Sequence, residues 1–79
     1  MEKHTFTFGS DHLDVNGNSL GKAYVVIEGD LESSRETMFS LRGRDWAFQY
    51  RSPEEAGAER WNLREVPIEQ IALYNTDTV

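Results

Sequence analysis

The chain has 79 residues and no cysteine, which predicts one domain over residues 1–79, excludes disulfides and thiolate metal sites, and favours a reducing cytoplasm. Its 14 acidic and 8 basic residues leave a formal net charge of −6, which argues against general nucleic-acid binding and is compatible with a basic partner, including a protein that itself holds nucleic acid. No apolar run reaches the length of a signal peptide or the roughly 18 residues of a membrane span, so we expect a cytoplasmic protein without a membrane partner.

The first third of the chain predicts two strands joined by a polar loop. "HTFTF", residues 4–8, alternates polar and apolar side chains and places Phe6 and Phe8 on one face of a strand. "AYVVIE", residues 23–28, is β-branched and aromatic with apolar residues on both faces, which is typical of a central strand.

The loop "DHLDVNGNSLGK", residues 11–22, is the densest group of possible metal ligands in the chain. Aligned as a calcium loop on Gly17, it has His12 at the first ligand position and Ala23 in place of the closing glutamate. "NGN" is instead a strong turn signal, because Asn-Gly supplies the positive φ angles of a tight hairpin. We therefore predict a turn and no bound metal.

The segment "GDLESSRETMFSLRG", residues 29–43, predicts the one substantial helix. Asp30 is a candidate N-cap, and so is Ser33, which has Glu36 three residues later as in a capping box. Acidic residues come early and an arginine comes late, as the helix dipole favours. Gly43 predicts the end of the helix.

After this helix the pattern returns to strands. "WAFQYR", residues 46–51, alternates, and we expect its aromatic face to pack under the helix. "SPEEAGAE" predicts a short helical turn or loop, and "RWNLREV", residues 60–66, predicts a strand that Pro67 ends. "IEQIALY", residues 68–74, predicts a short turn that closes the core. The order strand, strand, helix, strand, strand predicts an α+β fold, in which an antiparallel sheet of about four strands carries one helix on one face.

No motif for catalysis or for a cofactor emerges from the chain. No serine lies in a G-x-S-x-G elbow, and no glycines form a phosphate-binding loop. We predict no catalytic, cofactor-binding or metal-binding residues and no enzyme activity. The arginines with nearby aromatics are typical of a nucleic-acid face or of a protein hot spot. The stronger interpretation is that the aromatics are core residues and that the arginines pair with Glu54, Glu55 and Glu59.

The string "SLGKAYVVIEGDLESSRETMFSLRGRDWAFQYRSPEEAGAERWNLREVP" resembles a family of small proteins encoded by bacteriophages and prophages. The most specific elements of the resemblance are "WAFQY" at residues 46–50 and "AGAERW" at residues 56–61. It implies a phage accessory protein that acts in the bacterial cytoplasm. We expect similarity to anti-CRISPR inhibitors of a type I-C surveillance complex, which act by stoichiometric binding and not by turnover.

Under that expectation an acidic surface occupies a basic DNA channel, or mixed contacts block the channel sterically. The predicted partner-binding residues are Glu28, Asp30, Glu32, Glu36, Arg42 and Arg44. The alternative function is a phage accessory protein that self-associates or binds nucleic acid weakly through an arginine-bearing face made of Arg42, Arg44, Arg51, Arg60 and Arg64.

Overall fold

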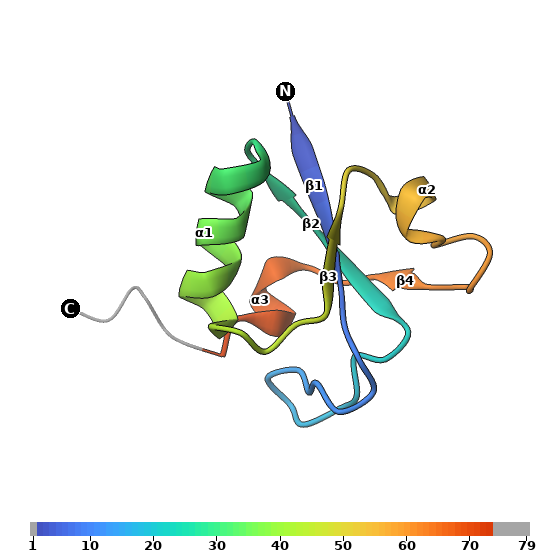
Figure 1. Ribbon diagram of the computed structural model, residues 1–79. Coiled ribbons are helices and arrows are strands. Elements are labelled where there is room, and N and C mark those ends of the chain that lie inside the picture. Colours follow the sequence, from blue (N-terminus) through green and yellow to red (C-terminus); the bar gives the residue numbers. More distant parts are fainter. Residues whose placement is uncertain (1, 74–79) are drawn as a thin grey trace.

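A mixed four-stranded sheet and three helices make up the fold in the computed structural model, which describes residues 2–73 (Figure 1). In chain order the elements are β1 (Lys3–Thr7), β2 (Ala23–Glu28), α1 (Leu31–Arg42), β3 (Phe48–Tyr50), α2 (Pro53–Ala56), β4 (Arg64–Glu65) and α3 (Ile68–Ile71). The predicted α+β class is confirmed, because four strands carry the one long helix on one face.

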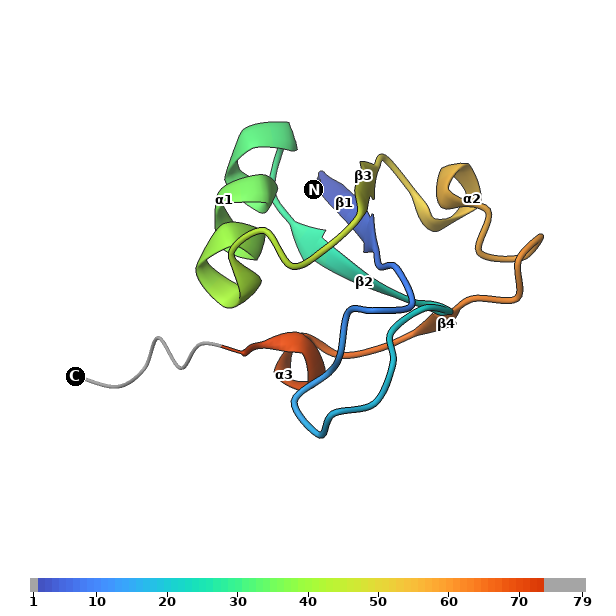
Figure 2. The ribbon, with the colours of Figure 1, turned by 60° about the horizontal axis from the view of Figure 1, so that its bottom comes forward.

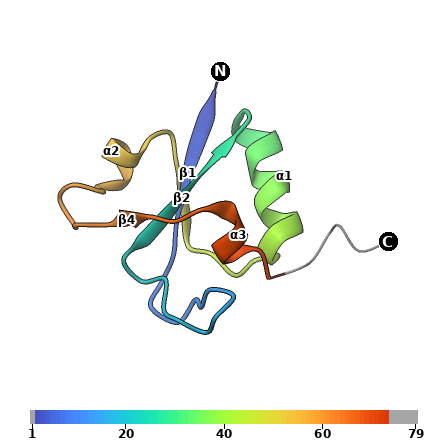
Figure 3. The same cartoon turned by 180° about the vertical axis from the view of Figure 1, so that it is seen from behind.

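The strands lie in the order β3-β1-β2-β4. β1 pairs antiparallel with both β2 and β3, whereas β4 runs parallel to β2 at the far edge (Figure 3). The predicted antiparallel sheet is therefore correct for two of the three pairings. The third differs because residues 51–63, with α2 among them, carry the chain across the sheet from one edge to the other, which is the kind of crossover that parallel strands require.

The helices divide between the two faces of the sheet (Figure 2). α1 and α3 cover one face, which we call the α1 face, and α2 packs against β1 and β3 on the other, the α2 face. The core lies on the α1 face and joins Phe6 and Val25 of the sheet to Met38 of α1 and Ile71 of α3, all at most 1% exposed. The predicted closing turn is confirmed at residues 68–71, while residue 74 lies outside the described residues.

Helix α1 begins and ends where the sequence predicts. The Asp30 side chain accepts a hydrogen bond from the backbone N–H of Ser33, and the Ser33 hydroxyl accepts one from the backbone N–H of Asp30. Asp30 is thus the N-cap, and Ser33 takes the third helical position of the capping box. Gly43 ends the helix with a positive φ of 64°.

The face of β3 is opposite to the one predicted. Phe6 pairs with Gln49 across the sheet, so Gln49 points toward α1, where its amide donates to the Leu31 carbonyl and the Ser34 hydroxyl. Phe48 is consequently turned to the α2 face and is 64% exposed. Trp46, outside the strand, still packs edge-on against Phe6 and Phe39. The predicted aromatic stripe under the helix is wrong for the two strand residues, because pairing with β1 decides which set of alternating side chains faces the helix.

The predicted strand over residues 60–66 is also wrong for most of its length. Only Arg64–Glu65 pair with β2, and the segment before them is a series of turns that includes Asn62 at a φ of 56°. Trp61 lies in these turns and is 60% exposed.

The polar loop before β2 forms the predicted turn. Leu13 and Ser19 form an isolated antiparallel bridge, and Gly17 has a φ of 84°. Asp14 is buried beneath the turn, where one carboxylate oxygen accepts from the backbone N–H groups of Asn16 and Asn18 and the other from the Gln70 amide. These hydrogen bonds, that of Asn18 first, lower the pKa of Asp14 against the opposing effect of its burial.

Candidate binding surfaces

The four acidic residues predicted to bind a partner lie where β2 passes into α1. Glu28 is the last residue of β2, Asp30 caps α1, and Glu32 and Glu36 lie one turn apart on the helix. Glu28, Glu32 and Glu36 are exposed, and among residues 2–73 none of them forms an ion pair with a cation. Glu32 and Glu36 lie on the outward side of α1, whereas the alternation of β2 turns Glu28 to the α2 face, because its neighbour Ile27 is buried. We call these three acidic residues, which follow one another in the chain, the acidic patch.

Asp30 has a structural role within this region. Its carboxylate accepts hydrogen bonds from the backbone N–H of Ser33 at 2.8 Å and from the Ser33 hydroxyl at 2.9 Å. These hydrogen bonds, the backbone one first, lower the pKa of Asp30, so the group stays ionised and adds to the local negative field. Direct contact with a partner would compete with the cap, and we therefore leave Asp30 out of the patch.

Arg42, which was predicted to contact a partner, is an interior residue that is only 1% exposed. Its guanidinium donates to the carbonyl oxygens of Asp45, Ile71 and Leu13 and to the Asp45 carboxylate, at 2.6 to 2.9 Å. It also lies 5.2 Å from the ring centroid of Phe8. Arg42 thus joins the end of α1 to the end of α3 and to the polar loop.

Arg44 is exposed but lies past the C-terminal end of α1. A helix of 12 residues is about 18 Å long, so Arg44 stands at the opposite end of it from Glu28 and Glu32, while Glu36 lies near its middle. The predicted partner-binding residues therefore separate into an acidic patch, a cap, a buried arginine and a distant exposed arginine.

The predicted arginine-bearing face does not form. Arg51 follows β3 and Arg64 lies in β4, which are the two opposite edges of the sheet. Arg60 lies over the ring of Trp61, with 5.4 Å from its guanidinium carbon to the ring centroid. The other interpretation fails as well, since within residues 2–73 no arginine forms an ion pair with Glu54, Glu55 or Glu59.

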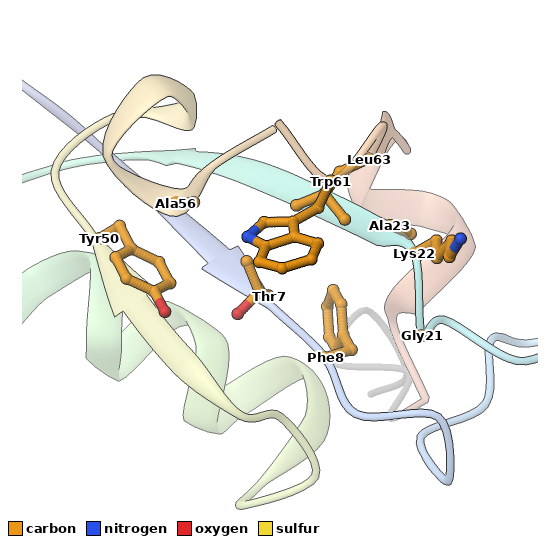
Figure 4. Close-up of a pocket in the computed structure, with 9 residues that line it drawn as sticks. All are labelled: Thr7, Phe8, Gly21, Lys22, Ala23, Tyr50, Ala56, Trp61 and Leu63. Carbon is orange, nitrogen blue, oxygen red and sulfur yellow. The ribbon is translucent and has the colours of Figure 1, made fainter. Parts of the chain in front are cut away.

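A hollow beside Trp61 on the α2 face was not predicted from the sequence. It has a volume of about 310 Å³, and residues from both central strands, β3 and the turn after α2 line it (Figure 4). The alternating pattern of "RWNL" predicts a strand that includes Trp61. The structure has a turn there instead, with a positive φ at the next residue, Asn62. An Asn after an aromatic residue is the one local signal of that turn, since Asn tolerates the left-handed region.

The remaining chemistry of the described chain is sparse. Among residues 2–73 no three His, Asp or Glu side chains converge as a metal site requires, and no helix there is long and apolar enough to cross a membrane. Comparison of the chain with protein-family models, with curated proteins and with solved structures found no match.

Proposed function

We propose that this protein inhibits a nucleic-acid-processing complex of a bacterial host by stoichiometric binding in the cytoplasm, and that its target is a type I-C CRISPR surveillance complex. The observation that carries the proposal is the acidic patch, whose three carboxylates are exposed and unpaired in the described part of the chain. A basic channel that holds DNA phosphates is a complementary surface for such a patch. Occupation of the channel by the patch excludes target DNA.

The physical basis of this inhibition is competition for the same cations. Binding of the patch neutralises lysines and arginines that otherwise contact phosphates, so its strength falls as salt rises, as that of DNA does. The exposed Arg44 at the other end of α1 does not suit a pure DNA mimic. It leaves room for mixed contacts that block the channel sterically.

The test is co-elution of the protein with a purified type I-C surveillance complex, followed by a gel shift with target DNA. We expect a stoichiometric complex that no longer binds DNA. The decisive variant is Glu28→Lys/Glu32→Lys/Glu36→Lys, which reverses the patch and keeps the Asp30 cap. Its matched control, Glu59→Lys/Glu65→Lys/Glu69→Lys, has the same formal charge and alters exposed acids elsewhere.

Loss of co-elution in the patch variant alone supports the proposal. Equal loss in both variants indicates that net charge, and not this patch, drives binding. If the unaltered protein neither co-elutes nor blocks DNA, the CRISPR target is wrong.

The second candidate function is self-association, and one observation favours it. Phe48 is 64% exposed on β3, an edge strand of three residues whose outer side is unpaired in the described sheet. Exposed edges with apolar side chains are typical of strand-to-strand pairing between copies. A dimer by light scattering that Phe48→Ser converts to a monomer, without co-elution of any host complex, would establish this function in place of inhibition.

A further inference from the structure

The hollow beside Trp61 differs electrostatically from the rest of this acidic protein. None of the nine residues that line it is acidic, although the chain carries 14 acids. Its polar groups are the hydroxyls of Thr7 and Tyr50, the indole N–H of Trp61 and the ammonium group of Lys22. The indole N–H and the ammonium group only donate hydrogen bonds, and the two hydroxyls donate or accept, so the hollow favours a ligand that carries acceptors.

These donors are not used by the protein itself. Among residues 2–73 the side chains of Thr7, Tyr50, Trp61 and Lys22 have no hydrogen-bond or ion-pair partner. In Figure 4 the two hydroxyls and the indole nitrogen face one common space, and Lys22 stands at the other end of the hollow, beyond Phe8 and Ala23. Donors at one end and a cation at the other define an axis along which a ligand is oriented.

The walls between these polar ends are flat and apolar. The indole of Trp61 forms one wall, with Leu63 beside it, and Phe8 and Ala23 supply apolar surface toward the Lys22 end. Gly57 holds the indole close, because it has a φ of 80° and a Cβ there would lie only 2.7 Å from Cδ1 of Trp61. An aromatic wall of this kind favours stacking of a planar ring.

We propose that this hollow binds a small planar ring that carries one anionic group, with the ring against Trp61, its acceptors toward Thr7 and Tyr50, and the carboxylate or phosphate on Lys22. The volume of about 310 Å³ lies at the small end of the range for ligand sites, which suits one ring system and one charged group. The site is on the α2 face, so it is independent of the acidic patch and of the proposed inhibition.

The test is a titration in which a candidate ligand is added to the ¹⁵N-labelled protein and the NMR signals of the two indole N–H groups are monitored. The probes are indole-3-carboxylate and adenosine 5′-monophosphate, each paired with its neutral counterpart, indole-3-carboxamide or adenosine. We expect the Trp61 signal to shift with an acid. The Trp46 signal is an internal control, because its N–H already donates to the Gly43 carbonyl at 2.9 Å. A response to only one of the acids supports the proposal and shows which of the two combinations of ring and anionic group fits the hollow.

Two matched variants test the cation. Lys22→Gln should weaken binding of the acid about tenfold, the loss expected for one charge-assisted contact. Lys3→Gln makes the same change of charge at an exposed lysine of another hollow and should leave affinity unchanged. The proposal is overturned if neither acid moves the Trp61 signal at millimolar concentration, if the neutral counterparts bind as well, or if both lysine variants weaken binding equally.

Discussion

Replacement of Arg42 by methionine tests how this fold holds its C-terminal half. Methionine keeps most of the length of the side chain but donates no hydrogen bond. The carbonyl oxygens of Ile71 and Leu13, which lie 2.9 Å from the guanidinium nitrogens, then lose their donor. Each unsatisfied buried acceptor costs about 1–3 kcal/mol.

The Asp45 carboxylate adds less to this cost, because its side chain is 45% exposed and recovers water when the arginine is gone. We therefore expect Arg42→Met to lower the free energy of unfolding by about 2–5 kcal/mol, which is the combined cost of the two carbonyl oxygens left without a donor. A domain of 79 residues has roughly 4–12 kcal/mol in total, so the variant is close to the limit of folding.

The assay is urea unfolding at neutral pH followed by far-UV circular dichroism. Arg44→Met makes the same chemical change at an exposed site and should alter stability by no more than about 0.5 kcal/mol. If Arg42→Met fails to fold, Arg42→Lys provides the measurement, because it keeps the charge and loses the planar fork, and it should fall between the two. A cost below about 1 kcal/mol for Arg42→Met, the net value of a single ordinary hydrogen bond, would refute this account of Arg42.

Three further predictions concern stability at acid pH, the turn after α2 and helix α3. Because the pKa values of Asp30 and Asp14 are lowered in the folded protein, their stabilisation is present above the ordinary aspartate value of 3.8 and is lost as pH falls through their folded values. Asparagine at position 30 still caps the helix, so Asp30→Asn removes the titrating group and keeps the cap. In this variant and in Asp14→Asn, the free energy of unfolding in urea should fall less steeply with acid pH than in the unaltered protein. An equally steep fall in both variants contradicts this assignment. Gly57→Ala should lower the free energy of unfolding by about 1 kcal/mol or more, because φ is 80° and the new Cβ meets the Trp61 ring. It should also shift the NMR signal of the Trp61 indole N–H, and an unshifted signal would show that the ring is not held against Gly57. Ile71→Ala, at a side chain of 0% exposure, should cost about 2–5 kcal/mol and Ile71→Val about 0.5–1.5 kcal/mol; equal small losses would mean that α3 does not close the core.

Local signals explain the elements that the sequence predicts well. Asp30, Ser33 and Gly43 satisfy backbone groups within a few residues of themselves, so the bounds of α1 follow from nearest neighbours. The Asn-Gly turn in the polar loop is equally local. The acidic patch also follows from short spacing, because Glu32 and Glu36 share a helix face one turn apart.

Long-range contacts explain the elements that sequence reasoning missed. Alternation in "WAFQY" is visible in the sequence, but the pairing of Gln49 with Phe6 decides that the amide lies under α1 and that Phe48 faces away. Arg42 looks like an exposed residue at a helix end until α3 and the polar loop, each 29 residues distant, bring their carbonyl oxygens to it.

The α+β class, the bounds of α1, the turn in the polar loop and the acidic charge can be derived from the sequence, because each depends on composition or on contacts within a few residues. The parallel pairing of β4 with β2, the face of β3 that meets the helix, the burial of Arg42 and the donor-lined hollow beside Trp61 are visible only in the folded chain. Each of these depends on which distant segments pair, and side-chain periodicity carries no information on that pairing.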